Sequence, residues 1–421
     1  MKKIINTLVV KIASRCNINC TYCYMYNHED QSYKLQPKFI SKKTIFDLTK
    51  RIENHCIKHA ITHFNIIFHG GEPLLTDLSY FRWILTEINS LKKHRINIHF
   101  YVQSNGMLIS KEYCALFNEF NVKIGISLDG VKEIHDLHRL DKKGQGTYNR
   151  VVHGIEIADQ YMNHDLGSLS VLNLKSNPIE TYNTYRALNF KTIDFLLLDE
   201  NYDSFPQIEE TLTKLQNSDW LITLFDYWYA EKDNHRLYLR KFENIISLLF
   251  NNHEQYETIQ DQKNSVAVIE TNGNIEPLDV LKICGESFTK TIFSVHDNEL
   301  DAIFENDLID LYYDGNSLLP KKCLACPVME VCGGGYFPHR YSSTNGFNNP
   351  SIYCNDLLKL ITHIQCTIVD SIPEELRQEI GIEKLSYEKA LEIIEETLPT
   401  ISEPYYIERL ENYRKKEDAT I

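Results

Sequence analysis

The sequence predicts an α/β fold built on parallel strands. Short apolar runs alternate with helix-like patterns from the first residues to about residue 198, and the alternation repeats six times. Parallel strands need crossover connections, so this repeat predicts strands joined by right-handed crossovers through helices. Polar and glycine-rich motifs follow several of the runs, at the carboxyl ends of strands, where folds of this class carry their active sites. With 421 residues, the chain is long enough for two or more domains.

The first 200 residues hold the predicted strands and their helices. Ser41 is a suitable N-cap, and Ile45, Leu48 and Ile52 follow it at helical spacing. Further helices are expected over 78–91, 113–120 and 151–158. The strands are expected at 8–13, 66–68, 96–102, 122–128, 169–174 and 193–198.

Beyond residue 200 the alternation stops. Residues 371–398 are expected to be helical, opened by a capping box from Ser371 to Glu374, and residues 411–421 to fray. Residues 207–260 are also expected to be helical, with one apolar face that contains Trp220, Leu221, Leu224, Phe225 and Trp228. We therefore expect four parts: an α/β part (1–200), a helical bridge (201–262), a cysteine-bearing part (263–370), and C-terminal helices with a tail (371–421).

Charge and composition narrow the class of protein. A formal net charge of −14 argues against a nucleic-acid partner, because neutralising phosphates needs a basic face, and it is compatible with a basic peptide partner. No apolar run reaches the ~18 residues that span a bilayer. Lys11 and Arg15 interrupt the apolar start, which predicts a strand rather than a signal peptide. We expect a cytoplasmic protein without membrane contact. In a reducing cytosol, its eleven cysteines indicate metal ligation, with Cys56, Cys114 and Cys366 in the core.

Three cysteines fall close together, spaced Cys16-x3-Cys20-x2-Cys23. A four-iron cluster normally takes four thiolates, so a loop with three predicts one iron open to another ligand. A structural zinc site is the alternative, but such sites usually show paired CxxC hooks and four closed ligands. The spacing, with Tyr22 before the last cysteine, resembles the signature of the radical S-adenosylmethionine (SAM) enzymes. The resemblance implies a partial (β/α)6 barrel and a [4Fe–4S] cluster whose open iron is chelated by SAM. It also implies a 5′-deoxyadenosyl radical that abstracts hydrogen from the substrate.

Short polar motifs after the predicted strands match the SAM pocket of that family. The resemblance assigns the Gly-Gly-Glu-Pro motif after the second strand to the SAM amino group, with glycines that let backbone approach a ligand. Motifs after the third and fourth strands place polar groups where the ribose and methionyl parts would lie, and Arg139 is a candidate partner of the SAM carboxylate. A polar turn or a capped helix is the alternative for each motif. The predicted cofactor-binding residues are Tyr22, Gly70, Gly71, Glu72, Pro73, Ser104, Asn105, Ser127, Asp129 and Arg139.

A second cysteine group has the pattern Cx2Cx5C, followed after 21 residues by a fourth cysteine. Four thiolates can close a cluster with no open iron, and a zinc site is the alternative. The pattern resembles the SPASM extension of radical SAM peptide-modifying enzymes, which in full holds two auxiliary clusters. Tyr336 stands where another cysteine is usual, and Cys284 resembles a ligand of the missing cluster. We expect one auxiliary [4Fe–4S] cluster, with Cys284 free or an occasional ligand. The predicted metal ligands of the two groups are Cys16, Cys20, Cys23, Cys323, Cys326, Cys332 and Cys354.

The segments Gly333–Tyr341 and Gly346–Pro350 resemble SPASM maturases that form cyclophanes in ribosomally made peptides (RiPPs). Those enzymes link an aromatic ring carbon to the β-carbon of a residue two positions later. Such a link removes two hydrogens and two electrons, which predicts the auxiliary cluster as electron acceptor and a base for the proton. Asp279 is the first candidate base and His339 the second, with structural hydrogen bonding as the alternative for each.

The resemblance also implies partners: a ribosomal precursor peptide and an electron donor such as flavodoxin or ferredoxin. Because the barrel is expected to begin near residue 7, precursor binding is expected at the barrel edge, at residues 200–260, in the C-terminal region or on a separate protein. A thioether-forming or sulfatase-type radical SAM maturase is the alternative function, and a zinc-stabilised binding protein is the third. Tyr336 and the His339–Tyr341 segment argue against the sulfatase type.

Overall fold

The computed structural model describes residues 3–205, 214–232, 236–252, 264–315 and 317–412. By internal packing, the chain divides into two units. The first comprises residues 1–176, 180–198 and 265–310, and the second comprises residues 177–179, 199–264 and 311–421. Residues 265–310, which we expected in the cysteine-bearing part, thus pack with the α/β part. Among the residues that the structure describes, no helix is both long and apolar enough to cross a bilayer.

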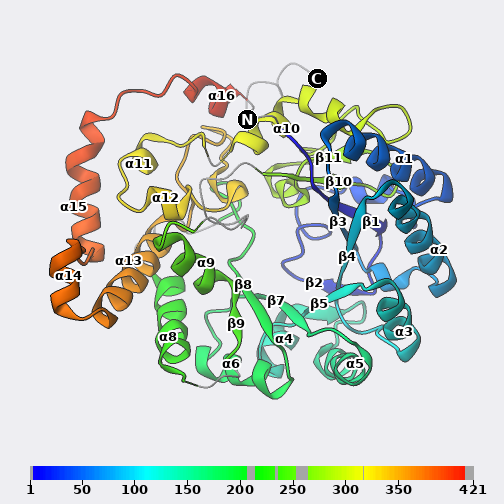
Figure 1. The fold of residues 1–421 in the computed structure, drawn as a ribbon, viewed down its shortest axis with the longest axis horizontal. Coiled ribbons are helices and arrows are strands. Elements are labelled where there is room, and N and C mark those ends of the chain that lie inside the picture. Colours follow the sequence, from blue (N-terminus) through cyan, green and yellow to red (C-terminus); the bar gives the residue numbers. More distant parts are fainter. Residues whose placement is uncertain (1–2, 206–213, 233–235, 253–263, 316, 413–421) are drawn as a thin grey trace. The chain divides into compact units, whose positions relative to one another are not determined.

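The first unit is built on a parallel sheet that contains the six predicted strands. They lie in the order β1-β3-β4-β5-β7-β8, and each pairs in parallel with its neighbour (Figure 1). Their bounds are β1 (Thr7–Ala13), β3 (His63–Gly70), β4 (Asn97–Ser104), β5 (Lys123–Ser127), β7 (Gly167–Val171) and β8 (Thr192–Leu196). The order and direction confirm the α/β fold.

Alternating burial along the strands explains why these residues form the sheet. In β3, Phe64, Ile66 and Phe68 are fully buried, whereas the residues between them are partly exposed. In β1, Leu8 and Val10 are fully buried. Burying each side chain of this size contributes about 1.5–3 kcal/mol. The sheet core is therefore made of the apolar runs from which the strands were predicted.

The sheet continues beyond β1 through two strands that the sequence analysis missed. β10 (Val266–Ile269) pairs in parallel with β1, with Thr7 opposite Val266, and β11 (Ile275–Glu276) pairs antiparallel with β10. Strands this short offer too few residues to show an alternating pattern. A separate small sheet joins β2 (Ile18–Cys20) to β6 (Arg139–Asp141).

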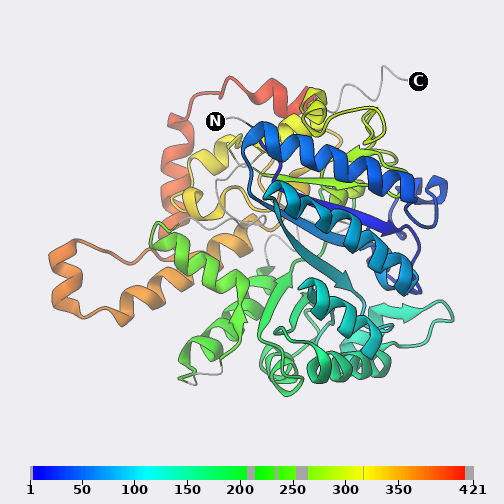
Figure 2. The same ribbon diagram turned by 45° about the vertical axis from the view of Figure 1, so that its right-hand side comes forward.

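The helices of the first unit include those predicted. Ser41 caps α1 by accepting a hydrogen bond from the Thr44 amide, as expected. α1 and α2 lie side by side along the sheet (Figure 2). The α-helices are α1 (Lys42–His59), α2 (Leu78–Asn89), α3 (Lys111–Phe120), α4 (Lys132–His138) and α5 (Tyr148–Tyr161). Two further helices, α6 (Pro178–Ala187) and α10 (Asp307–Asp314), have residues in both units. The 3₁₀ helices are η1 (Ser32–Leu35), η2 (Pro73–Leu75), η3 (Ser90–His94), η4 (Asp279–Cys284) and η5 (Leu300–Glu305).

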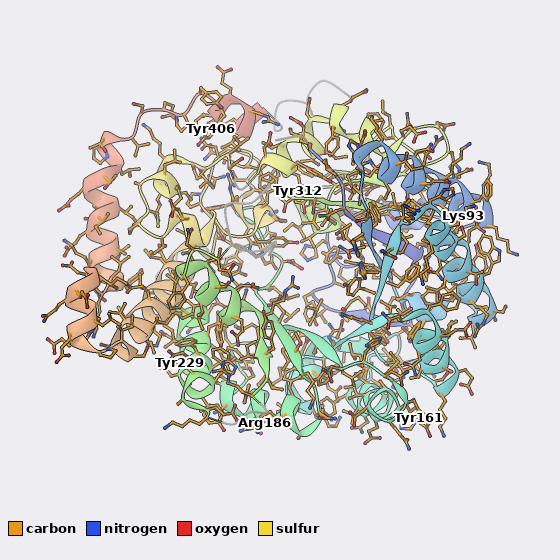
Figure 3. The ribbon with its side chains drawn as sticks, in the orientation of Figure 1. Lys93, Tyr161, Arg186, Tyr229, Tyr312 and Tyr406 are labelled. Atoms are coloured by element: carbon orange, nitrogen blue, oxygen red, sulfur yellow. The ribbon has the colours of Figure 1, made fainter. Side chains whose placement is uncertain are left out.

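The second unit is mainly helical. The apolar face predicted within residues 207–260 is buried on α8, while residues 206–213, 233–235 and 253–263 of that prediction lie outside the described residues. Tyr406, which is labelled in Figure 3, directly precedes the C-terminal α16. Its hydroxyl donates to the Leu319 carbonyl at 3.0 Å. The elements of the second unit are α8 (Gln216–Ala230), β9 (Tyr238–Leu239), α9 (Arg240–Leu249), α11 (Lys321–Leu324), α12 (Met329–Cys332), η6 (Phe337–Arg340), α13 (Cys354–Ser371), α14 (Glu374–Ile380), α15 (Tyr387–Thr397), η7 (Leu398–Thr400) and α16 (Ile407–Asn412).

The predicted capping box at Ser371 is wrong. Ser371 ends α13, and its hydroxyl donates back to the Ile368 carbonyl at 2.6 Å. Pro373 occupies the N-cap of α14 without a side-chain hydrogen bond. A serine in the last turn of a helix satisfies its hydroxyl locally, so it is no longer available to the next helix. Most of the predicted frayed tail, residues 413–421, lies outside the described residues.

Candidate functional site

The loop after β1 carries the first three cysteines. The Cys23 amide donates to the Cys20 carbonyl at 3.0 Å, which turns the chain between these two residues. β2 then pairs with β6 so that Cys20 lies opposite Arg139. All three thiols are free of disulfides, and burial raises the pKa of Cys16 and of Cys23 to about 12. Thiols buried in this way become thiolates when a metal binds, so the loop fits a metal cluster.

Glu72 joins the ends of β3 and β4. Its carboxylate is fully buried and accepts hydrogen bonds from the Ser104 hydroxyl (2.8 Å), the Asn105 amide (2.8 Å) and the Leu74 amide (3.0 Å). The sequence predicted Glu72 and Ser104 as separate contacts to SAM. In the structure they bond to one another, so both hold the loops of the predicted pocket in place.

Gly70 and Gly71 are needed because other parts of the chain leave no room for a side chain at these positions. A Cβ on Gly70 would overlap the Ala13 carbonyl, and a Cβ on Gly71 would overlap the Arg15 carbonyl and the Tyr26 hydroxyl. We expected these glycines to let backbone approach a ligand. The structure gives a reason within the fold, since they let the loop after β3 pass against the cysteine loop.

Asp129, after β5, contacts two further predicted pocket residues, Tyr22 and Arg139. Its Oδ2 accepts from the Tyr22 hydroxyl and from Arg139 Nε, the latter at 3.0 Å. Its Oδ1 accepts from the Val171 amide at 3.1 Å. Arg139 Nη1 lies 3.9 Å from Cys20 Sγ. Arg139 is thus positioned beside the cysteine loop by a buried carboxylate, and contact with a SAM carboxylate stays a prediction.

The other predicted pocket residues follow the same strands. Asn105 Nδ2 donates to Asn17 Oδ1 at 2.7 Å and lies 3.7 Å from Cys16 Sγ. Ser127 Oγ accepts from Gln103 Nε2 at 2.8 Å. Pro73 opens η2 directly after Glu72. The structure therefore gathers side chains from the ends of β3, β4 and β5 around the cysteine loop.

Asp279, the first candidate base, lies in a buried ionic network. Lys11 Nζ is 3.4 Å from its Oδ2, the Tyr24 hydroxyl donates to it at 3.0 Å, and His69 Nδ1 is 3.7 Å away. Although burial opposes ionisation, Lys11 and these donors hold the pKa of Asp279 well below its usual range. Lys11 Nζ also donates to Glu270 at 2.8 Å.

This network was not predicted from the sequence, although Lys11 pointed to it. In the sequence, Lys11 interrupts an apolar run, and in the structure its side chain is fully buried in β1. A lysine inside a core strand almost always has a buried anionic partner. Lys282 extends the network, with Nζ 3.1 Å from Glu276 and 3.3 Å from Glu270.

The four cysteines of the second group line one cavity in the second unit. Lys322 also contributes to the wall of this cavity. The four thiols are free of disulfides, and burial raises the pKa of Cys323 to about 12 and that of Cys326 to about 11. Four convergent thiols around one space fit a closed four-thiolate cluster. The cysteines that line this cavity are Cys323, Cys326, Cys332 and Cys354.

The remaining cysteines behave largely as expected. Cys56 and Cys114 are buried in α1 and α3, whereas Cys366 on α13 is only half-buried. Cys284 is buried in η4, which belongs to the first unit.

The segment Gly333–Tyr341 is fixed by a buried arginine. Arg340 is fully buried and donates to the carbonyls of Gly315 (2.7 Å), Leu318 (2.6 Å) and Phe347 (3.1 Å). Its neighbour His339, the second candidate base, is also buried, and its Nε2 lies 4.0 Å from Asp199. Burial lowers the pKa of His339 to about 3.

Comparison with known proteins identifies the family. The model of the radical SAM superfamily matches residues 10–209. An uncharacterized protein of Methanocaldococcus jannaschii is 32% identical over 216 residues, which are 50% of this chain and 70% of that protein. The chain belongs to the radical SAM superfamily.

Other similar proteins include named sulfatase-maturating enzymes and a protein solved with a precursor peptide. The cysteine-type anaerobic sulfatase-maturating enzyme of Clostridium novyi is 24% identical over 359 residues, which are 84% of this chain and 93% of that enzyme. The solved structure of anSMEcpe with bound AdoMet has a TM-score of 0.74 at 22% identity and covers 87% of this chain and 98% of its own. Streptococcus suis SuiB, solved with its precursor peptide SuiA, has a TM-score of 0.54 at 16% identity, covering 80% of this chain and 72% of its own. These structural matches confirm the fold.

Radical SAM membership supplies the cofactors. The superfamily binds SAM and a [4Fe–4S] cluster, and this chain has both a three-cysteine loop for such a cluster and a separate set of four cysteines. The buried thiols of both sets fit iron–sulfur clusters. The assignment of each cysteine to a cluster, and of each pocket residue to SAM, stays a prediction of the sequence.

Proposed function

We propose that this radical SAM protein is a maturase that joins an aromatic ring carbon of a precursor peptide to the β-carbon of a residue two positions later. The observation that carries the oxidative part of the proposal is the second cysteine set, in which four cysteines line one cavity. Forming this carbon–carbon bond removes two hydrogen atoms, which are two protons and two electrons, from the peptide: one leaves as an abstracted hydrogen atom and the other as a separate proton and electron. A protein that performs it needs an electron acceptor in addition to the group that abstracts hydrogen, and a closed four-thiolate cluster would serve as that acceptor.

In this proposal the cofactors supply the hydrogen abstraction, and the residues of the chain bind and position the cofactors. When bound, SAM and the cluster of the three-cysteine loop supply the hydrogen-abstracting 5′-deoxyadenosyl group. Cys16, Cys20 and Cys23 would hold that cluster, and Arg139, fixed by Asp129, lies beside the loop. Glu72 keeps the ends of β3 and β4 together, so the residues of the predicted pocket are held in place before a ligand arrives.

The proton lost from the ring needs an acceptor, and Asp279 is our first candidate. Lys11 and Tyr24 keep its carboxylate ionised, so it is ready to accept. Because its pKa is depressed, it accepts protons only from strong acids, and an oxidised aromatic ring is such an acid. His339 is the second candidate, and its low pKa makes it a neutral acceptor at pH 7.

The similar proteins support a peptide or protein partner. The Clostridium novyi relative is named for maturation of sulfatases, and SuiB was solved with a precursor peptide. We expect an electron donor of the flavodoxin or ferredoxin type for this chain as well. The cyclophane product rests on the likeness of Gly333–Tyr341 and Gly346–Pro350 to cyclophane maturases, and on Tyr336 in place of a further cysteine.

A sulfatase-maturating activity is the second candidate function. It is favoured by similarity to the Clostridium novyi enzyme along 84% of this chain. This oxidation also removes two electrons, so the four-thiol site alone does not distinguish it from a crosslinking reaction. The product does, because maturation changes a single cysteine or serine and joins no two residues.

The test is a mass measurement on defined peptides. The reconstituted protein, SAM and a reductant are incubated with peptides that carry aromatic-x-x triplets, taken from short reading frames beside its gene. We expect a loss of two hydrogens per crosslink that persists in a cysteine-free peptide and disappears when the aromatic residue becomes Ala. A loss that requires a cysteine would instead indicate a thioether synthase. Conversion of a peptide that carries the sulfatase cysteine, with no change in the aromatic peptides, would establish the second function.

A further inference from the structure

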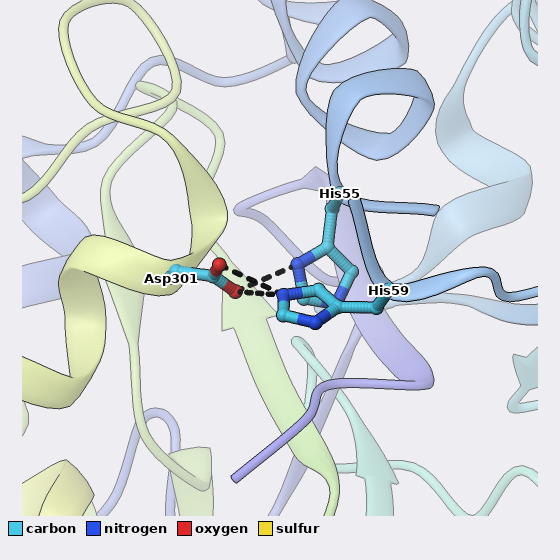
Figure 4. Close-up of side chains that lie close together, drawn as sticks. All are labelled: His55, His59 and Asp301. Carbon is cyan, nitrogen blue, oxygen red and sulfur yellow. Dashed lines mark hydrogen bonds and ion pairs between the residues drawn. The ribbon is translucent and has the colours of Figure 1, made fainter. Parts of the chain in front are cut away.

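A cluster of two histidines and one aspartate lies in the first unit, between α1 and η5. His55 and His59 stand one turn apart on α1, and both imidazoles point at the Asp301 carboxylate (Figure 4). His55 Nδ1 is 2.9 Å from Asp301 Oδ1, and His59 Nε2 is 2.8 Å from Oδ2. The ligand atoms of the three residues all lie within 4.8 Å of one another.

The hydrogen bond on the far side of His55 sets its tautomer. His55 Nε2 is 2.8 Å from the Ile5 carbonyl, which can only accept, so Nε2 carries the proton. In the neutral imidazole, the lone pair of Nδ1 then faces a carboxylate oxygen at 2.9 Å. Two acceptors at this distance repel each other unless a cation lies between them. A backbone carbonyl that fixes the distal N–H is also the usual support of a histidine that binds a metal.

We propose that His55, His59 and Asp301 bind a zinc ion. Imidazole nitrogen with carboxylate oxygen is a zinc-type ligand set, whereas calcium and magnesium prefer oxygen alone. Both histidine side chains are 1% exposed and Asp301 is 22% exposed, so a water can complete a tetrahedral site from the Asp301 side. No thiol belongs to this cluster, which separates it from both cysteine sets.

The side-chain ammonium of Lys58 already contacts this cluster. Lys58 Nζ is 2.6 Å from Asp301 Oδ2, and its side chain is 61% exposed. An exposed lysine on a flexible stem can turn into solvent when a metal binds. Arg51 and Asn54, also on α1, hold Glu299 next to this segment. The zinc would therefore fasten η5 to α1 at a point where the two already meet.

The test uses the holoenzyme with its iron–sulfur clusters filled, so that zinc cannot enter the cysteine sites. Zinc is supplied alone, and bound metal is measured after desalting together with the zinc K-edge absorption spectrum. We expect about one zinc per chain with only nitrogen and oxygen ligands. The isosteric variant Asp301→Asn and the variant His59→Gln should lose most of this zinc while keeping their iron. His63→Gln, in an exposed histidine pair with His99, is the matched control and should keep the zinc.

A doubly protonated His55 paired with Asp301 would explain the same contact without a metal, and in that case the wild type would take up no zinc here. For a zinc site, Lys58→Met should keep or strengthen zinc binding, because it removes a competing cation from Asp301. Zinc should also raise the unfolding temperature of the wild type but not that of Asp301→Asn. If the wild type takes up no zinc, if the spectrum shows sulfur ligands, or if Asp301→Asn and His59→Gln both retain the metal, the proposal is wrong.

Discussion

The loops of the predicted pocket are held in place by buried polar side chains. Glu72, Asp129 and Lys11 are all buried, and each is satisfied by partners from another strand or loop. A buried charge that loses its partner costs about 3–5 kcal/mol, so each of these contacts fixes loop geometry strongly. Their role in this structure is to position the cysteine loop and the ends of β3, β4 and β5.

Gly71 offers a direct test of this positioning. In Gly71→Ala the new methyl group would overlap the Arg15 carbonyl and the Tyr26 hydroxyl. We expect a loss of about 1–3 kcal/mol in the free energy of unfolding and reduced iron in the three-cysteine loop, measured by denaturant unfolding and metal analysis. Gly167→Ala is the control, because the nearest atom to its added Cβ lies 3.8 Å away. Equal effects in the two variants would contradict the packing argument.

His135 should make stability depend on pH. Its Nδ1 accepts from the Asp129 amide, and its Nε2 faces the hydroxyl of Thr147, which itself donates to the Arg139 carbonyl. The ring is therefore neutral, and burial lowers its pKa to about 4 from the usual 6.5. Below pH 6.5 the unfolded chain takes up a proton that the folded chain refuses, so stability falls as the pH drops towards 4.

The expected contribution of His135 is about 1 kcal/mol lost between about pH 7.5 and 5.5. In His135→Gln the dependence of unfolding free energy on pH should be flatter over this interval, measured by urea unfolding at several pH values. His153→Gln is the control, since His153 is well exposed on the same unit. An unchanged slope in His135→Gln would show that other groups dominate this window.

At the scale of single elements, helix starts were predictable only where the capping side chain was free to act. Ser41 was recognised correctly because nothing but α1 competes for its hydroxyl. Ser371 was misassigned because the turn before it already takes that hydroxyl. Similarly, β2 and β6 could not be predicted, since each has three residues and is stabilised by the other from far along the chain. Pairing of this kind leaves no local pattern.

The two serines make a matched pair for experiment. In Ser41→Ala, the Thr44 amide loses its acceptor, and the free energy of unfolding should fall by about 1 kcal/mol. In Ser371→Ala, only a bond within the last turn of α13 is lost, and the change should stay within about 0.5 kcal/mol. Thermal or denaturant unfolding of the two variants side by side measures the difference. If the free energy of unfolding falls more in Ser371→Ala than in Ser41→Ala, Ser371 caps α14 after all, and this account of its hydroxyl is wrong.

At the scale of the molecule, the sequence predicted the parallel sheet, both cysteine sets and the superfamily, because all three leave local signals in spacing or apolar pattern. It did not predict that residues 265–310 pack with the first unit. It also did not predict which buried charges pair, such as Lys11 with Glu270. Those contacts join segments more than 250 residues apart, and no local periodicity records them.

The two cysteine sets predict the iron content of the whole chain. With one four-iron cluster in each set, we expect about eight irons per chain. Replacing Cys16, Cys20 and Cys23 together by Ala should leave about four irons and abolish SAM cleavage, measured by iron analysis and chromatography. Cys114→Ala, a buried thiol on α3, is the control and should leave the iron unchanged. Twelve irons in the wild type would mean a second auxiliary cluster and would bring in Cys284.

The pairing of β10 with β1 also bears on the order in which the chain is made. Translation delivers β1 first, while β10 and the partners of Lys11 follow some 250 residues later. Until they emerge from the ribosome, one edge of β1 lacks its partner strand and the Lys11 ammonium lacks its counter-charges. An open strand edge invites wrong pairing, and a lone ammonium opposes burial. In a nascent chain halted before residue 266, we therefore expect the edge of β1 that later pairs with β10 to stay unpaired. The first unit, whose synthesis begins first, would then complete its folding only after β10 has been made.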